Sequence, residues 1–538
     1  MKEYYKFIRT NFFTNKRLFI IYSFLLVCFI CMEILFPVLT GEFINLLVEK
    51  KNFNAIIIFL VLIATIGLLN QLLNVFKMIF YNKYSEYTKN ELRLKIIDII
   101  RHSKYEDLNI INSASFTQRV NMDLSQIISF VTDSMVMFFL RLIQFVVVLV
   151  YIFTLDYFLG LLTILFLPIY AFVYYIFKKR LYNCADKAKN ATAEYYELFN
   201  SQVNDIDDII HSGKYEIENT NFNNGFLSYF RTFKEYIFVN LKFDFSQGIV
   251  ALLLNVVMFA ICANRIVNGD MKVGTLTVLM SFFTMLLSTI GYVFETAKNY
   301  QLAIASLDKI MAIFKLKQYE EGINKLEDKV ENITATIKFG YGEEWLYKDL
   351  NVAFSSNNMY GVLGFNGKGK STLYKILMGI IKSEDSCIKI NNIIIDELDT
   401  VFLRDKHIYF VKQNPTSNKA SIGEYFLNKL NITSFYEIKD MLKFKDISSD
   451  LLEKFLKEKW DYAMDELSGG DLKTVYLIES FLTEKEVKIY DEPTTNLDID
   501  RRSWFINAIT KVKEGNIIIV ITHDEELYPK FNNTIILD

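Results

Sequence analysis

The stretch Gly364-Phe365-Asn366-Gly367-Lys368-Gly369-Lys370-Ser371-Thr372 follows an apolar, strand-like run at residues 359–363 and fits the phosphate-loop pattern G-x-x-x-x-G-K-[ST]. The glycines let successive backbone N–H groups close around phosphate oxygens. Lys370 supplies positive charge to the outer phosphates, and the Ser371 hydroxyl can ligate Mg²⁺. A chance glycine-rich turn would read the same way, so the prediction of a bound nucleoside triphosphate depends on further motifs along the chain.

A second apolar run, residues 487–490, ends in two adjacent carboxylates, Asp491 and Glu492. Open α/β sheets bind their ligands at the carboxyl ends of strands, so groups that face a phosphate are expected here. Asp491 is expected to hold Mg²⁺ through water. Glu492 is placed to act as the general base that orients and deprotonates the attacking water. An Asp-Glu pair is common on solvated surfaces, but the run before it favours the site.

The composition indicates a membrane protein. Of the 538 residues, 52% are hydrophobic, 15% are aromatic and 22% are charged, a balance that a soluble enzyme would find hard to keep in solution. The net charge of −3 gives no indication of nucleic-acid binding. The five scattered cysteines are interpreted as apolar packing residues, because no second Cys or His pair accompanies Cys28 and Cys31.

Six apolar segments are long enough to cross a bilayer, which takes about 20 helical residues. They cover residues 18–40, 55–80, 134–155, 157–177, 245–266 and 275–294. The first segment lacks a small-residue cleavage site and is expected to stay as a membrane helix. Lys and Arg gather in the amino terminus and at residues 178–180, which predicts that both termini and both long loops are cytoplasmic.

The long loops, 81–133 and 178–244, keep a helical pattern of apolar and charged positions. The membrane helices are therefore expected to continue into the cytosol as arms. After them the chain becomes charged and then takes the alternation of an α/β region. This predicts a transmembrane domain at residues 1–314, a linker at 315–330 and a soluble domain at 331–538.

The soluble domain resembles the ATP-binding cassette of ABC transporters. After the phosphate loop come Gln413 at a predicted strand end, the signature Leu467-Ser468-Gly469-Gly470-Asp471, the pair Asp491-Glu492, the D-loop Asn496-Leu497-Asp498, and His523 after an apolar run. Several independent motifs in one order make coincidence implausible. Six spans ahead of one cassette is the layout of an exporter-type half-transporter. The implied fold is an all-α six-helix transmembrane domain plus an α/β P-loop NTPase cassette.

The resemblance implies a role for each motif residue. Glu492, His523 and Gln413 would be catalytic, and Ser371, Gln413 and Asp491 would hold Mg²⁺. The residues expected to contact ATP are Tyr341, Gly364, Asn366, Gly367, Gly369, Lys370, Ser371, Thr372, Ser468, Gly469, Gly470 and Asp498. In this family the signature completes the site of a partner chain. A second half-transporter, in a homodimer or a heterodimer, is therefore an implied partner.

Some parts of the resemblance are less specific. Tyr341 is expected to stack on adenine, with a packing role as the alternative in so aromatic a chain. Asp471 stands where the family usually has Gln, and residues 459–465 lack the glycine-rich element that exporters carry ahead of the signature. Segments that couple the arms to cassettes are expected near residues 105–118 and 205–224 by the same analogy.

Within the predicted spans, Glu33 and Arg141 lie in apolar runs, where a lipid-facing charge costs about 2.5–3.5 kcal/mol. They are expected to face a cavity or each other, and direct contact with cargo is an alternative role.

The resemblance implies ATP-driven export by a dimer in a cell membrane, with the cassette in the cytoplasm. A composition poor in Pro and Ala and rich in Ile, Lys and Asn suggests an AT-rich bacterial genome, and the expected membrane is a bacterial plasma membrane. The expected cargo is a peptide of the bacteriocin-like or signalling kind. The alternatives are a lipid or hydrophobic drug, or a sensory or regulatory ABC protein without vectorial transport. No marker in the sequence excludes uptake, whereas the six spans disfavour a soluble cassette protein acting on ribosomes or DNA.

Overall fold

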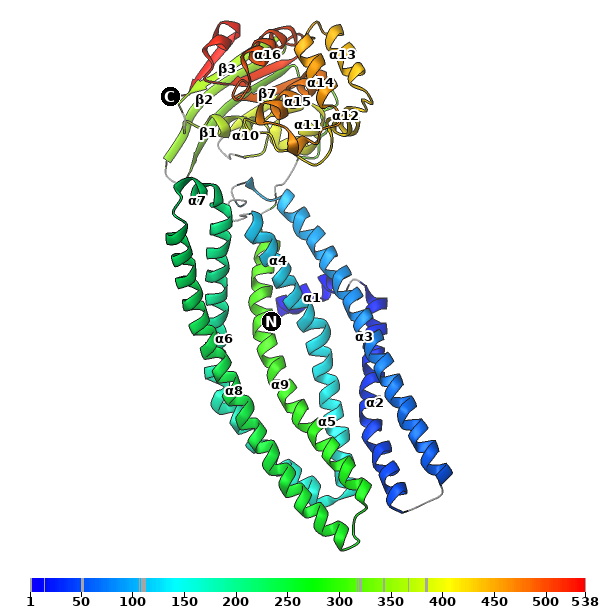
Figure 1. Ribbon diagram of the computed structural model, residues 1–538. Coiled ribbons are helices and arrows are strands. Elements are labelled where there is room, and N and C mark those ends of the chain that lie inside the picture. The colour runs from blue at the N-terminus through cyan, green and yellow to red at the C-terminus, as the bar shows by residue number, and fades with distance from the viewer. Residues whose placement is uncertain are drawn as a thin grey trace. The chain divides into compact units, whose positions relative to one another are not determined.

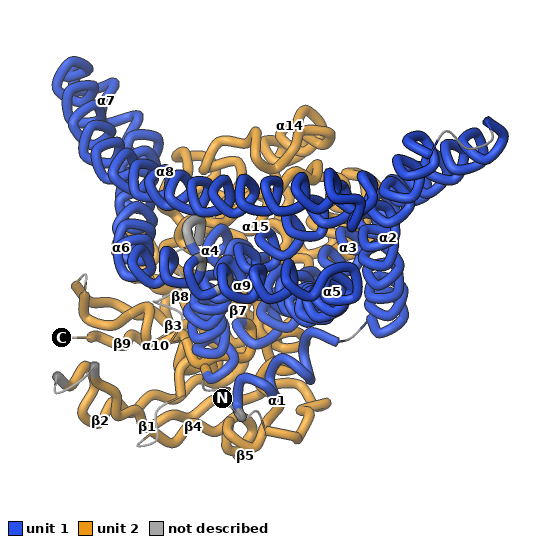
Figure 2. The backbone as a smooth tube through the Cα atoms, turned by 90° about the horizontal axis from the view of Figure 1, so that it is seen from below, with its two compact units in different colours: residues 1–100, 111–315 blue, residues 101–110, 316–538 orange. Residues whose placement is uncertain are grey.

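The computed structural model describes residues 2–13, 15–49, 53–105, 107, 113–316, 318, 322–341, 344–365, 367–382 and 386–537. The chain divides into two compact units, residues 1–100 with 111–315 and residues 101–110 with 316–538 (Figure 2). The short segment 101–110 thus belongs with the second unit by its contacts. The domain boundaries expected at residues 314 and 331 stay predictions.

Long helices make up the described part of the first unit (Figure 1). They are α1 (Lys2–Asn11), α2 (Lys16–Val48), α3 (Phe53–Arg101), α4 (Ser113–Ile128), a π-helical turn η2 (Ser129–Ser134), α5 (Met135–Leu155), α6 (Tyr157–Asn204), α7 (Ile206–Ser212), α8 (Tyr215–Val267) and α9 (Val273–Phe314). Six continuous helical segments are long and apolar enough to cross a membrane. Each predicted span lies within one of them, so the prediction of six membrane helices is confirmed.

The helices extend well past their apolar windows. α3 has 49 residues and α8 has 53. At 1.5 Å per residue they are about 75 and 80 Å long, whereas a bilayer's hydrocarbon core is about 30 Å thick. The expectation that the membrane helices continue as arms is therefore confirmed.

Packing in the first unit centres on α9, which contacts α2, α4 and α5, while α6 and α8 run side by side (Figure 1). Phe282 and Phe283 of α9, Ile152 of α5 and Leu254 of α8 are fully buried in one apolar cluster. Many large apolar side chains elsewhere on the spans are exposed, among them Phe158. Such a surface suits helices that are surrounded by lipid.

The second unit is built from short strands and helices. They are β1 (Asn332–Tyr341), β2 (Glu344–Ser355), β3 (Asn358–Gly364), α10 (Lys370–Leu377), β4 (Cys387–Ile390), β5 (Ile393–Ile394), η3 (Ile395–Glu397), α11 (Thr400–Lys406), β6 (Ile408–Val411), α12 (Ile422–Leu430), α13 (Phe435–Phe444), α14 (Asp450–Lys459), η4 (Met464–Glu466), α15 (Gly469–Leu482), β7 (Val487–Asp491), α16 (Ile499–Lys511), β8 (Ile517–Ile521), η5 (Glu525–Lys530) and β9 (Asn533–Leu537).

Two sheets organise this unit. A five-stranded sheet has the order β6-β7-β8-β3-β9, and its neighbours pair in parallel. A four-stranded sheet has the order β2-β1-β4-β5, and its neighbours pair antiparallel. All five residues of β8, Ile517–Ile521, are buried, as expected for a parallel strand covered on both faces. The fold expected from the sequence, a six-span helical domain followed by an α/β cassette, is confirmed.

Candidate functional site

The carboxyl ends of three neighbouring strands meet at one edge of the parallel sheet. Val362 of β3 and Asp491 of β7 both lie beside Ile521 of β8 in the strand registers. The chain therefore leaves all three strands at the same place: β3 enters the phosphate loop at Gly364, and β8 ends two residues before His523. Parallel pairing brings together groups that are more than 150 residues apart in the sequence.

The phosphate loop connects β3 to α10, with Gly369 as the residue that precedes the helix. Gly367 and Gly369 have φ angles of +84° and +87°, which side chains with a Cβ rarely adopt. Tyr347 fixes the loop from outside, because its hydroxyl donates to the Gly369 carbonyl at 2.6 Å. At the helix start Thr372 is buried and Ser371 is exposed. With the loop backbone held in this way, the exposed Ser371 at the start of α10 is accessible to a ligand.

Three charged or titratable side chains converge above the loop. The Lys370 ammonium donates to the Gly364 carbonyl at 2.6 Å and lies 2.9 Å from Nε2 of His523. The same nitrogen of His523 lies 3.6 Å from a carboxylate oxygen of Glu492. Three of the residues predicted to bind and hydrolyse a triphosphate, Lys370, His523 and Glu492, thus lie close together.

Glu492 is held by its backbone. Its φ angle is +46°, its N–H donates to the Ile521 carbonyl at 2.8 Å, and its carbonyl accepts from the Lys473 ammonium at 2.8 Å. Lys473 also donates to the Thr495 carbonyl at 2.9 Å. Burial lowers the pKa of the Lys473 ammonium from 10.5 to about 8, although the charges of Glu492 and Asp491 oppose the shift. Lys473 thus positions the backbone of Glu492.

The residues expected to hold Mg²⁺ supply suitable donors. Burial and the neighbouring charge of Glu492 raise the pKa of the Asp491 carboxyl. A divalent cation would relieve this repulsion, and hydroxyl, carboxylate and amide oxygens are the ligands that Mg²⁺ prefers. Ser371 is the second residue of α10, whereas Gln413 lies exposed two residues after β6. No described contact joins the Gln413 side chain to the other two.

The signature begins α15, with Ser468 as its N-cap and its hydroxyl accepting from the Asp471 N–H at 3.2 Å. Ser468 and Gly469 are exposed, and Gly470 is half-buried. Asp498 caps α16 by accepting from the Arg501 N–H at 2.7 Å. Within the described residues no contact joins Ser468 to the phosphate loop. The start of α15 is thus exposed at Ser468 and Gly469.

Two predicted contacts lie outside what the structure describes. Asn366 is outside the described residues, and so is the side chain of Tyr341, whose backbone ends β1. Their expected contacts with nucleotide stay predictions.

Sequence reasoning missed Tyr347, Lys473 and Arg501, which support the site through their partners. Tyr347 belongs to none of the motifs from which the site was predicted. Lys473 is a charged residue in the mostly apolar helix α15, a pattern that indicates a buried partner but does not name it. Arg501 bonds to Asp471 at 2.7 Å, and this pairing explains how a carboxylate is accommodated at that signature position.

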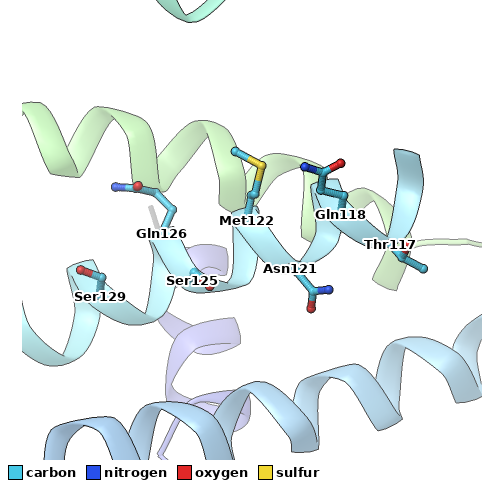
Figure 3. A pocket seen from close by; sticks show the side chains of 7 residues that line it. All are labelled: Thr117, Gln118, Asn121, Met122, Ser125, Gln126 and Ser129. Carbon is cyan, nitrogen blue, oxygen red and sulfur yellow. The ribbon is translucent and has the colours of Figure 1, made fainter. Parts of the chain in front are cut away.

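The first unit carries an open hollow of about 730 Å³ along one helix (Figure 3). Its lining consists of Thr117, Gln118, Asn121, Met122, Ser125, Gln126 and Ser129, from α4 and the start of η2. Six of these seven side chains are uncharged hydroxyls or amides. The hollow is open, and its lining can form hydrogen bonds with a polar ligand.

Glu33 and Arg141 face each other, which was one of the two arrangements expected. Arg141 donates to Glu33 at 2.6 Å and to Gln144 at 2.7 Å, and Gln144 lies 2.9 Å from the Met285 sulfur. The pair joins α2 to α5 within their apolar windows, and each charge finds its partner there, with side chains that are 18% and 23% exposed.

Two family models match the chain. The model of the ABC transporter transmembrane region matches residues 19–290, and the model of the ABC transporter cassette matches residues 347–495. A protein of Rickettsia typhi whose name describes an export ATP-binding/permease protein is 23% identical over 83% of this chain and 79% of its own length. The "Transport/processing ATP-binding protein ComA" of Streptococcus pneumoniae is 22% identical over 77% of this chain and 59% of its own length.

Among solved structures, a bacterial Atm1-family ABC exporter with ATP bound has a similar fold. The TM-score is 0.77 at 14% identity, over 97% of this chain and 93% of that one. At this identity the likeness shows the fold.

Proposed function

We propose, since the chain belongs to the ABC transporter family, that it is one half of an ATP-driven exporter whose two ATP sites are shared between two chains. It is an ATPase coupled to membrane transport, with the exporter fold. The observation that carries the proposal is the convergence of Lys370, His523 and Glu492 at one sheet edge, where His523 lies 2.9 Å from the Lys370 ammonium and 3.6 Å from the Glu492 carboxylate.

The cluster can perform phosphoryl transfer to water. Lys370 and His523 would hold the outer phosphate, with Gln413 near it, while the loop amides from Gly367 to Thr372 hold the inner phosphates. Glu492 would orient the attacking water and take its proton, because its carboxylate is close to His523 and its backbone is fixed by Lys473. Mg²⁺, held by Ser371, Asp491 and Gln413, would offset the charge of the phosphates.

The signature supports a shared site. Ser468, Gly469 and Gly470 start a 14-residue helix whose free N–H groups attract phosphate. They make no described contact with the chain's own loop, so the phosphate they serve would belong to a second half-transporter. Asp498 ends the D-loop and would lie at the same interface.

Coupling between the arms and the cassette would pass through segment 101–110. Within the second unit, the Tyr105 hydroxyl accepts from the Lys375 ammonium at 3.0 Å, and Lys375 lies on α10, directly behind the phosphate loop. Closure of the phosphate loop on ATP would therefore displace Tyr105, in the segment that follows α3, through its hydrogen bond with Lys375. The second expected coupling segment, residues 205–224, would include the short helix α7 and the first residues of α8.

For cargo we favour a peptide over a lipid or a hydrophobic drug. The hydroxyl and amide groups along α4 can form hydrogen bonds with a peptide backbone, which is rich in hydrogen-bonding groups (Figure 3). The relative whose name joins transport to processing fits a cargo that can be cleaved. Both termini and the cassette would be cytoplasmic, by the distribution of Lys and Arg.

The test is transport by purified protein in sealed vesicles with outward-facing cassettes. We expect ATP to drive uptake of a fluorescent peptide library, and E492Q to abolish both uptake and ATP turnover. Turnover by E492Q at the wild-type rate would remove the proposed base. Uptake of labelled lipid or dye in place of peptide would revise the cargo, and normal turnover without any flux would favour a sensory role.

A further inference from the structure

Two adjacent arginines at the start of α16 reach toward different parts of the cassette. α16 begins after the D-loop, where Asp498 accepts the Arg501 backbone N–H at 2.7 Å and caps the helix. The Arg501 side chain extends to the signature segment. The Arg502 side chain extends to the loop that carries His523.

Arg501 binds the carboxylate of Asp471 at 2.7 Å, and both side chains are largely buried, at 15% and 8% exposed. Asp471 also accepts from Lys459 at 2.6 Å and from the Ser468 hydroxyl at 2.7 Å. The guanidinium of Arg501 further stacks over the Phe455 ring, 4.9 Å from its centroid. Arg501 is therefore fixed relative to Ser468, the signature residue proposed to meet a partner's phosphate.

Arg502 binds Asp524 through a two-pronged fork, with its Nε at 2.9 Å from one carboxylate oxygen and its Nη2 at 2.6 Å from the other. Asp524 directly follows His523, and its own N–H donates to the Thr522 hydroxyl at 2.9 Å. The Asp524 side chain is 7% exposed. Such a fork fixes direction as well as distance, so Arg502 sets the orientation of the turn that carries His523.

The backbone between these arginines and the signature is also tightly packed. A Cβ on Gly470 would clash with the Asn496 carbonyl, and Lys473 donates to both the Glu492 and Thr495 carbonyls. The signature helix therefore packs directly on the segment 492–496 that leads into α16.

We propose that Arg501 and Arg502 are positioning residues that link the two ATP sites of a dimer. Each chain lends Ser468 to its partner's site and uses His523 in its own, so the link runs from one site to the other through α16. This inference rests on the proposed shared sites. When the signature binds a partner's nucleotide, the position of Ser468 is fixed. Arg501 and Arg502 would transmit this position to the turn that carries His523, so that His523 lies over the chain's own nucleotide. The two sites would then close together.

A purely structural role is the competing explanation, because the same ion pairs also hold the cassette's elements in place. The two roles differ in what they change. A structural role alters the stability of the fold, whereas a link between sites alters the dependence of turnover on ATP concentration. With two coupled sites the Hill coefficient can approach about 2, and without coupling it falls to about 1.

The experiment measures ATP turnover against ATP concentration for the full chain in lipid nanodiscs. We expect R501Q and R502Q to lower the Hill coefficient from near 2 toward about 1. D471Q, which places the family's usual residue opposite Arg501, should act like R501Q, and the double variant should lose no more than either single one. K511Q is the matched control at the other end of α16, where Lys511 bonds to Asp446 at 2.6 Å, and it should leave the coefficient unchanged.

Unchanged cooperativity in a folded R501Q/R502Q variant would overturn the link while leaving the proposed function intact. R502K keeps the positive charge but cannot form both hydrogen bonds to Asp524. If R502Q has a lower melting temperature than the K511Q control, the Hill coefficient is measured on R502K instead. A wild-type coefficient of about 1, with no dimer captured by ATP in E492Q, would overturn the shared sites first and the link with them.

Discussion

The cassette and the membrane unit differ in how well the sequence predicts which side chains contact one another. In the cassette, Lys370, Glu492 and His523 lie together because each follows a strand end, and the strands pair in a fixed parallel order. In the membrane unit, the spans follow from hydropathy alone, but the partner of Arg141 could have been a cavity, cargo or Glu33. A phosphate site needs one particular backbone geometry, whereas a helix surrounded by lipid needs only sufficient length and apolar side chains.

This contrast predicts where substitutions should act. Residues that a ligand requires in the cassette should affect activity more than folding. Polar residues that satisfy one another inside the membrane unit should affect folding more than ATP turnover. Substitutions in both units therefore test whether activity is lost mainly in the cassette and stability mainly in the membrane unit.

Loss of the phosphate-loop lysine should have the largest effect. K370A removes the charge that lies 2.9 Å from His523 and is expected to lower ATP turnover by about 100-fold or more, with little change in the melting temperature. K389A, on an exposed position of β4, is the control for loss of a lysine. Turnover within a few-fold of wild type in K370A would contradict the assigned site.

Breaking the intramembrane ion pair should act on stability. E33A leaves Arg141 without its carboxylate and is expected to destabilise the membrane unit by about 3 kcal/mol, while E33M/R141M should recover part of the loss. Unfolding in detergent measures both. The exposed pair Lys272 and Glu49, 2.9 Å apart, is the control, and K272Q should cost much less than E33A. Equal costs for E33A and K272Q would show that Glu33 is not buried in the membrane.

Lys488 should make stability depend on pH. Its ammonium is buried in β7 and donates to the Thr483 carbonyl at 3.1 Å, and burial lowers its pKa from 10.5 to about 7. Between these values the unfolded chain binds more protons than the folded one, so this residue's contribution to stability rises with pH. The rise is at most about 1.4 kcal/mol per pH unit. Below pH 7 the cost of burying the charge is fully present.

The measurement is the melting temperature of wild type and K488M from pH 7 to pH 9. We expect wild type to gain on K488M as pH rises through this window. A constant difference between the two proteins would mean that Lys488 keeps its proton.

The smallest effect is expected from the surface pair Lys454 and Glu458 on α14, whose side chains are 76% and 60% exposed. K454Q should change stability by about 0.3 kcal/mol, close to the limit of a thermal melt. A larger loss would indicate that this face of α14 is covered in the assembled protein.

Sequence predicts the parts of the site that chemistry restricts to one residue type. Gly367 and Gly369 are predictable because their positive φ angles exclude most other residues. Lys473 and Arg502 are not, because their partners, Glu492 and Asp524, lie 19 and 22 residues away and are set by how α15 and α16 pack on the sheet. Likewise the π-helical turn at Ser129–Ser134 has no hydropathy signal.

Complementation between two inactive chains can decide whether each ATP site is built from two chains. Mixed dimers of a K370A chain and an S468R chain contain one site with an intact loop and an intact signature. With vanadate, we predict trapping of about one MgADP per mixed dimer and none in either parent dimer. No trapping in folded mixed dimers would show that the loop and the signature of one chain serve the same site, and would contradict the shared sites.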